Sequence, residues 1–243
     1  MKTSEKFAGP STHLVSTLAA VGLVLVLAKP AQAFGDHEFA GKGDHTFGSE
    51  WEHIVVPPVP PNLQVPAGNR VYREGHAVGT QDYVCMPCPN LITPAASCPA
   101  SGFAWAFFGP QATLFDVDDG DDHQIITHFL SPNPAEAGKP RPSWQDSRDS
   151  SIVWANNSSP PAQSSTDPAF VAAGAIPWLL LPVAGTQVGP TGGERLTDTT
   201  FIQRLDTAGG VAPAASTCAA ATDAGKKALV SYSADYFFYK ASK

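Results

Sequence analysis

Apolar and polar residues alternate over short segments along most of the chain, and turn-forming residues separate these segments. The segments are rich in β-branched and aromatic residues, as β-strands are. None of them keeps the 3.6-residue repeat of an amphipathic helix. The pattern therefore predicts an all-β protein, one antiparallel domain folded as a sandwich or a barrel. The clearest segments are FAWAFF (103–108), QIITHFL (124–130), SIVWA (151–155), TTFIQRLD (199–206) and KALVSYSADYFFY (227–239).

The one long apolar run lies near the N-terminus, at residues 14–28. Lys2 and Lys6 precede it and Ala31-Gln32-Ala33 follows it, which is the order of a secretory signal peptide with its cleavage motif. The run is shorter than the ~20 residues that a membrane-spanning helix needs. We therefore expect residues 1–33 to be removed, leaving a secreted protein, periplasmic or extracellular, without a membrane span. An uncleaved anchor is the alternative.

Residues 34–64 differ in composition from the rest, with glycine and histidine first and VVPPVPPNLQVP after them. Closely spaced prolines favour an extended polyproline II arm. We expect a tether or a strap that adds little stability, followed by a single β-domain over residues 65–243. Two proline-rich stretches are expected to interrupt that domain as unpaired loops, residues 131–144 and 156–170.

The charge of the chain limits the classes of partner. The formal net charge is -7, and it becomes -9 when Lys2, Lys6, Lys29 and Glu5 leave with the signal peptide. An acidic surface argues against nucleic acid or anionic lipid as a partner, because both carry negative charge.

The stretch VCMPCPNLITPAASC contains Cys85, Cys88 and Cys98, and the fourth cysteine is Cys218. A zinc site is disfavoured because the fourth ligand lies far away in sequence. A thioredoxin-like site is disfavoured because prolines flank Cys88, where a helix would have to begin. Four cysteines in an exported chain predict two disulfides, and spacing leaves three connectivities open.

The segment DVDDGDDH gathers carboxylates beside a histidine and has two interpretations. A divalent cation, the only cofactor that the sequence suggests, would have Asp116, Asp118, Asp122 and His123 as candidate ligands. The glycine is one position too early for an EF-hand loop, and Asp-Gly between two strands is a strong hairpin signal. We favour the hairpin. His37 and His45, in the repeated GDH of the arm, are further candidates for weak metal binding.

The sequence contains no nucleophile elbow, zinc-protease motif or phosphate-binding loop. His128, Asp146 and Ser147 supply the side chains of a catalytic triad, although only geometry identifies a triad. A turn after Trp144 is the structural alternative for Asp146 and Ser147. A core histidine bonded to the backbone is the alternative for His128.

Three other residues are candidate binding residues, Trp144, Trp178 and Arg204. Trp178 lies in a short apolar run of strand length, so burial in the core is its structural alternative. For Arg204 the alternative is an ion pair with Asp235.

Longer motifs occur in a fixed order between Val65 and Tyr239. They are IPWLL, IQRLDTAGGVAP followed by a cysteine, and YSADYFFY. In these motifs the chain resembles the secreted bacterial and fungal family catalogued as domain of unknown function 3455. The resemblance implies no activity. It does imply a pairing, because Cys85 and Cys218 belong to the shared framework whereas Cys88 and Cys98 belong to a local addition. The expected disulfides are therefore Cys85–Cys218 and Cys88–Cys98.

Together these observations predict a binding module for a small molecule, a glycan or a surface partner. The alternative is a hydrolytic or metal-assisted enzyme with His128 near its centre.

The first testable prediction concerns the N-terminus. Expression of the full chain in a host that recognises its export signal should give a mature protein beginning at Phe34, because the Ala-x-Ala motif ends at Ala33. The intact mass of the exported protein measures this directly. A mass that includes residues 1–33 would instead establish the uncleaved anchor.

Overall fold

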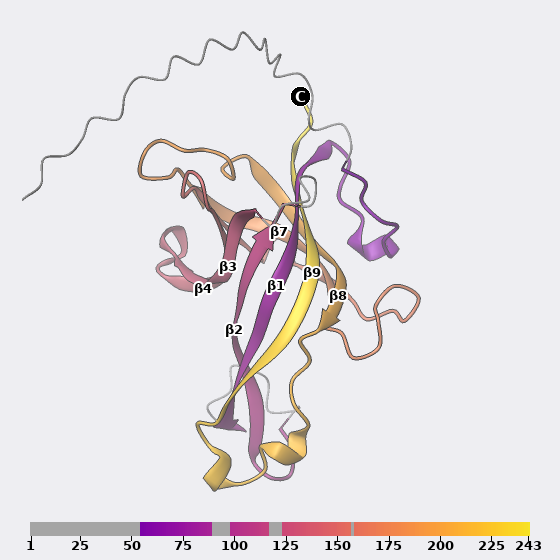
Figure 1. The fold of residues 1–243 in the computed structure, drawn as a ribbon, viewed down its shortest axis with the longest axis vertical. Coiled ribbons are helices and arrows are strands. Elements are labelled where there is room, and N and C mark those ends of the chain that lie inside the picture. The colour runs from indigo at the N-terminus through magenta and orange to yellow at the C-terminus, as the bar shows by residue number, and fades with distance from the viewer. Residues whose placement is uncertain (1–53, 89–97, 117–122, 157) are drawn as a thin grey trace, which may run out of the picture. The chain divides into compact units, whose positions relative to one another are not determined.

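A computed structural model describes residues 54–88, 98–116, 123–156 and 158–243. Strands dominate these residues, and the only helices among them are short 3-10 turns (Figure 1). The described part of the chain contains no helix long and apolar enough to span a bilayer. The strands are β1 (Asn69–Pro87), β2 (Phe103–Phe115), β3 (Gln124–Asn133), β4 (Lys139–Asp146), β5 (Ile152–Ala155), β6 (Gln163–Ser165), β7 (Trp178–Gln187), β8 (Thr199–Gly209) and β9 (Lys227–Ala241).

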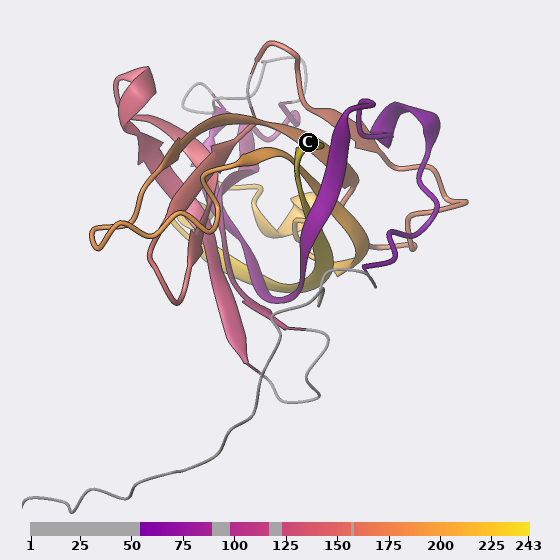
Figure 2. The ribbon, with the colours of Figure 1, turned by 90° about the horizontal axis from the view of Figure 1, so that it is seen from above.

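The strands form one closed antiparallel barrel. Their order is β5-β4-β3-β2-β1-β9-β8-β7, and a further pairing of β5 with β7 closes the ring. Figure 2 shows the strands surrounding a common centre. The short strand β6 pairs with the outer edge of β7 and lies outside the ring. The all-β prediction is confirmed, and of its two architectures the barrel is the one that forms.

Alternation along the strands fills the barrel with apolar side chains. The interior cluster is almost fully buried and draws on every strand of the ring. Trp144 and Tyr236 are the largest side chains in it, 0% and 1% exposed. Other members are Ala77, Leu114, Ile126, Val153, Leu181, Ile202 and Phe238.

A second apolar cluster lies on the opposite side of β7, β8 and β9. It contains Trp178, Leu180, Leu205, Phe237 and Tyr239. Both faces of these strands are therefore buried, which explains why YSADYFFY carries aromatic residues at consecutive positions.

Residues 54–65 cover this second cluster, and we call them the strap. Within the strap the 3-10 turn η1 (Pro61–Leu63) buries the Leu63 side chain completely. Gln203 Nε2 donates a hydrogen bond of 2.7 Å to the Leu63 carbonyl oxygen, which fixes the strap to β8. Of the tether and the strap that the sequence allowed, the structure has the strap. Residues 34–53 of the predicted arm lie outside the described residues, whereas residues 54–61 pack on the sheet without joining its ladder. That residues 34–61 add little stability stays a prediction.

The proline-rich stretch 131–144 is predicted by the sequence to stay unpaired, and this prediction is wrong. Residues 131–133 pair with residues 139–141 as the ends of a β3–β4 hairpin, and Pro132 lies opposite Pro140. Prolines at every second position place all the missing N–H groups on the same side of a strand, so the ladder on the other side survives. The stretch 156–170 contributes the three-residue strand β6.

Strands β1, β2 and β9 extend beyond the barrel as a three-stranded ribbon, seen at the lower end in Figure 1. Cys85 in this ribbon is bonded to Cys218, and Cys88 is bonded to Cys98. This is the pairing implied by the family resemblance. The longer bridge ties the 210–226 connection to the ribbon.

The strap makes a prediction about stability. Leu63→Ala should destabilise the fold by about 2–5 kcal/mol, because it removes a completely buried side chain and leaves a cavity. Val55→Ala is the matched control: Val55 is 81% exposed, so its loss should change the stability by less than about 0.5 kcal/mol. Urea unfolding of both variants measures the difference. Equal stabilities would show that the strap does not stay docked in solution.

Candidate functional site

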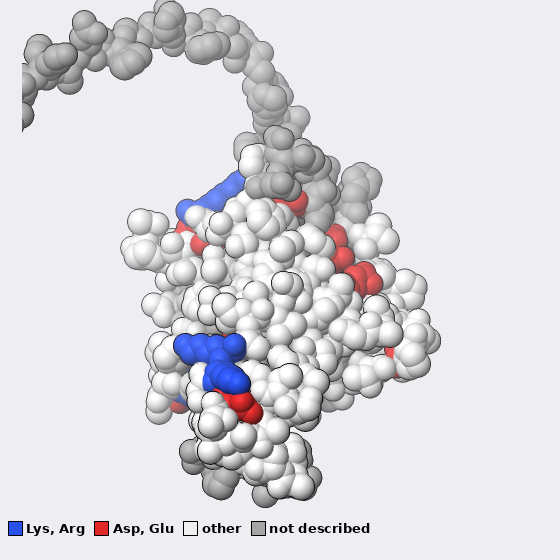
Figure 3. Space-filling model, turned by 60° about the horizontal axis from the view of Figure 1, so that its bottom comes forward, with Lys and Arg blue, Asp and Glu red and all other residues white. Residues whose placement is uncertain are grey.

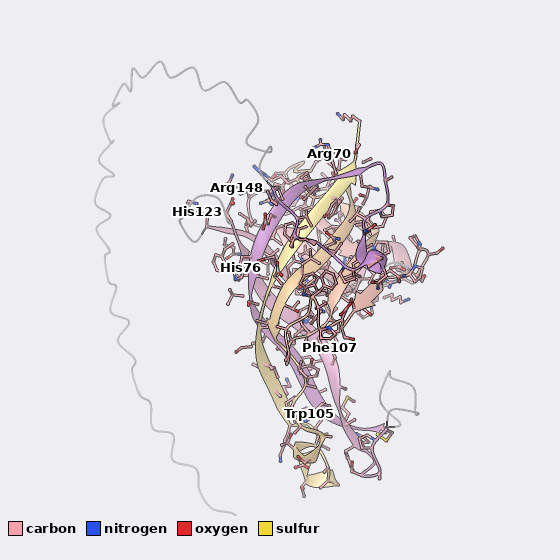
Figure 4. All side chains as sticks on the ribbon, turned by 90° about the vertical axis from the view of Figure 1, so that its right-hand side faces the viewer. Arg70, His76, Trp105, Phe107, His123 and Arg148 are labelled. Atoms are coloured by element: carbon pink, nitrogen blue, oxygen red, sulfur yellow. A yellow bond between two sulfur atoms is a disulfide. The ribbon has the colours of Figure 1, made fainter. Side chains whose placement is uncertain are left out.

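The barrel is hollow at the end from which the ribbon projects. A cavity of about 310 Å³ lies there, and we call it the mouth cavity. It is lined by residues of seven strands and of two adjoining loops. Figure 4 shows Phe107 at this end of the barrel, Trp105 farther down the ribbon and Arg70 at the opposite end. The lining residues are Gln81, Tyr83, Phe107, Pro110, His128, Pro142, Trp144, Asn156, Ile176, Pro177, Leu179, Leu181, Arg204 and Tyr236.

Most of the wall of the mouth cavity is apolar or aromatic. Leu179 and Leu181 face inward from β7, while Leu180 between them belongs to the outer cluster, as strand alternation requires. Phe107 packs edge-on against Tyr83 at a centroid distance of 5.9 Å and is itself 50% exposed, so it lies at the rim. The cavity has the composition of a site for a small organic molecule.

His128 projects inward from β3 and is 3% exposed. Its ring stacks on Trp144 at a centroid distance of 4.2 Å and an interplanar angle of 9°. Nδ1 is 2.9 Å from the Ser143 carbonyl oxygen, so it carries the proton and donates. Burial lowers the pKa of His128 to about 3, which the bond to Ser143 opposes. The ring is therefore neutral at pH 7, and Nε2 is an acceptor.

Arg204 enters the same cavity from β8. Its Nη2 and Nε donate to the Pro177 carbonyl oxygen at 2.8 and 3.3 Å. Its charge also lowers the pKa of His128 and partly offsets the burial that raises the pKa of Tyr236. Within the described residues no aspartate or glutamate forms an ion pair with Arg204. The mouth cavity thus holds a half-buried cation that lacks a counter-ion from the described chain.

Trp144 contributes a second donor. Its indole Nε1 is buried and has no hydrogen-bond acceptor within the described part of the chain. Tyr83, by contrast, donates its hydroxyl to the Gly210 carbonyl oxygen at 2.7 Å, and this bond fixes one side of the rim. The polar groups still available in the cavity are therefore chiefly donors, with His128 Nε2 as an acceptor.

The catalytic arrangement suggested by the sequence is not assembled. Asp146 lies on β4 opposite Ile126 and forms an ion pair of 2.8 Å with Arg73 instead of orienting His128. Its other oxygen accepts the backbone N–H of Arg148 at 2.8 Å. Ser147 accepts a hydrogen bond from Gln124, at 3.2 Å. Asp146 and Ser147 therefore serve the fold here.

Among the predicted binding residues, the structure brings Trp144 and Arg204 together with His128. Trp178 lies elsewhere, in the outer cluster beneath the strap, because it faces outward from β7. The proposed partner of Arg204 is also corrected: Asp235 accepts a bond of 2.6 Å from His76.

Sequence reasoning missed Gln81, Tyr83, Phe107 and Tyr236 as cavity residues. A signal existed for Tyr236, since positions 232 and 236 of YSADY share one face of a strand.

The structure describes only the two ends of the acidic segment, so it tests the hairpin prediction in part. Phe115 pairs with Gln124, and Asp116 N–H donates to the His123 carbonyl oxygen at 2.9 Å, as expected at the base of a hairpin. Asp118 and Asp122 lie outside the described residues, as do His37 and His45. Within the described ranges no group of three or more metal-ligating side chains occurs.

His128 yields a prediction about acid stability. Its folded pKa of about 3 lies below the unfolded value of 6.5, so only the unfolded chain binds this proton between those pH values. The stabilisation is complete above pH 6.5 and is lost as the pH falls toward 3, by up to ~1.4 kcal/mol per pH unit. His128→Asn should therefore cost about 1–3 kcal/mol at pH 7.5 and flatten the acid dependence of unfolding. The control is His76→Asn, at a half-exposed histidine. Equal slopes for the two variants would contradict the buried neutral state.

Comparison with known proteins identifies the family of the chain. No curated protein and no solved structure matches the chain. A family model described as a protein of unknown function (DUF3455) matches residues 66–240. The match begins directly after the strap and includes both disulfides, all residues of the mouth cavity and every strand of the barrel except the last residue of β9. The chain belongs to this family.

Proposed function

We propose that this is an exported binding protein whose mouth cavity takes up a small, largely apolar molecule carrying a carboxylate. The observation that carries the proposal is Arg204, a cation without a carboxylate partner among the described residues, in a cavity whose wall is mostly apolar or aromatic. A guanidinium remains charged at every physiological pH, and its planar fork matches a carboxylate. A ligand carboxylate would supply the missing counter-ion.

Two neighbouring groups fit the same ligand. The free indole N–H of Trp144 offers a further donor to an anionic oxygen. Neutral His128 leaves Nε2 for a hydroxyl or amide N–H elsewhere on the ligand. The stacked rings of His128 and Trp144 form a flat wall, which favours a planar or aromatic body.

The electrostatics of His128 favour binding over hydrolysis. A general base works best when its pKa lies near the operating pH, and the pKa of His128 is about 3. Its Nδ1 is held by a backbone carbonyl, so no carboxylate stabilises an imidazolium there. The two described disulfides and the N-terminal segment support the exported location.

The volume of the mouth cavity and the distribution of charged side chains on the surface are consistent with a small ligand. A cavity of about 310 Å³ lies at the lower end of the range typical of small-molecule sites. With the lower end of the molecule turned forward, charged side chains form only small separate groups on the visible face (Figure 3).

The proposal is tested with benzoate and cinnamate as probes, against benzamide and cinnamamide, by isothermal titration calorimetry. The carboxylates should bind more tightly than the amides. Arg204→Gln should weaken carboxylate binding about 10- to 100-fold, the value of one charge-assisted contact, and leave amide binding nearly unchanged.

Two further variants complete this test. Arg204→Lys keeps the charge but not the fork, so it should lie between wild type and Arg204→Gln. Arg70→Gln, at the far end of the barrel, should bind like wild type (Figure 4). Failure of both acids to bind at millimolar concentration, or equal affinity for acids and amides, would contradict the proposal.

A further inference from the structure

A second, larger hollow of about 620 Å³ lies along β1, β2 and β3, and we call it the lateral groove. It shares only Pro110 and His128 with the mouth cavity. The groove forms where β2 and β3 separate, because their pairing ends at Gln111 and Phe129 while both strands continue. Its walls are Val78, Gly79, Asp82, Phe108, Gly109, Pro110, Gln111, Ala112, Thr113, Thr127, His128, Phe129 and Leu130.

Asp82 is the one carboxylate among the described residues that line this groove. It lies on β1 between Gln81 and Tyr83, which both line the mouth cavity, so it faces the opposite side of the strand. Its residue exposure is 0%, and neither carboxylate oxygen has a hydrogen-bond partner. Asp82 is thus a completely buried acid that lines the groove and has no hydrogen-bond or ion-pair partner among the residues that the structure describes.

Such a group requires an explanation. Buried polar atoms in folded proteins nearly always have a partner, and a buried charge without one is strongly destabilising. The other buried acid, Asp146, shows the usual solution, since it has Arg73 and two backbone N–H groups.

Among the described residues, Lys227 is a cation that lies close to this region and does not pair with Asp82. Lys227 lies on β9 beside Leu229, the cross-strand partner of Asp82. Its Nζ is 5.7 Å from the centre of the Phe108 ring, and no ion pair joins it to Asp82. An aromatic wall of the groove therefore already accepts an ammonium group on its face.

From these contacts we infer that the lateral groove binds a small organic ammonium ion, with the ammonium on Asp82 and its apolar body against Phe108, Phe129 and Leu130. A single carboxylate among apolar walls suits an ammonium, which needs few oxygen ligands. Hard metal ions need six or more. The site shares only Pro110 and His128 with the mouth cavity, and its carboxylate, Asp82, does not line that cavity, so the inference does not depend on the function proposed there.

Binding requires a small movement. The carboxylate oxygens are covered, so a neighbouring side chain must open a path to them. Phe108 is suited to this role because it is the extra residue of a bulge opposite β1 and is 37% exposed.

The probe for this site is 2-phenylethylamine, which is a cation at pH 7.5, and its neutral control is 2-phenylethanol. Calorimetry should show at least tenfold tighter binding of the amine to the mature protein. Asp82→Asn should abolish this preference. The same variant should also melt at a higher temperature than wild type without amine, because it replaces a buried acid that has no partner among the described residues with a neutral amide.

Two control variants separate the alternatives. Asp206→Asn changes an exposed acid outside the groove and should leave amine binding intact. Lys227→Met should leave the melting temperature nearly unchanged and keep or tighten amine binding. The inference is overturned if the amine and the alcohol bind equally, or if Asp82→Asn binds the amine like wild type. It is also overturned if Lys227→Met and Asp82→Asn destabilise the protein to the same extent, since Lys227 is then the counter-ion.

Discussion

Closure of the sheet through β5 and β7 is the constraint on which the other features depend. Without that pairing, the four residues of β5 and the outer end of β7 would be open edges, and the inner face would need a second layer. With it, the inward side chains pack against one another, and the ring has two ends. One end is filled by side chains, and the other stays hollow enough to hold a ligand.

The two ends of the barrel differ in whether a charged side chain there has an oppositely charged partner. Toward the filled end, Arg73 and Asp146 form a buried ion pair of 2.8 Å. Burial lowers the pKa of Arg73, and the neighbouring Asp146 carboxylate opposes that shift. At the mouth, Arg204 donates to the Pro177 carbonyl oxygen and forms no ion pair with an aspartate or glutamate among the described residues. A compensated pair contributes to a defined fold, whereas an uncompensated cation leaves electrostatic attraction available to a ligand. The same contrast separates Asp146 from Asp82.

The strap and the disulfides support opposite parts of the molecule. The strap covers the outer faces of β7, β8 and β9, so these strands are buried on both sides, and Arg204 projects from a strand that is fixed from behind. The bridge between Cys85 and Cys218 holds the ribbon, where Tyr83 and Phe107 form one side of the rim. The strap and the disulfide both restrain strands that carry cavity residues, and neither of them lines the cavity itself.

The local sequence pattern was sufficient to predict the strands, because alternation and turn residues are properties of neighbouring positions. It predicted segments such as QIITHFL and TTFIQRLD, and the resemblance in motifs such as IPWLL supplied the family and the disulfide pairing. It also gave His128, Trp144 and Arg204 as candidates. Tertiary structure alone decided which candidates meet, since strand order and barrel closure depend on pairings between distant segments. Thus Asp146 pairs with Arg73, and Trp178 faces outward beneath the strap. Asp82, which has no distinctive sequence context, is a buried acid that lines the groove where β2 and β3 separate.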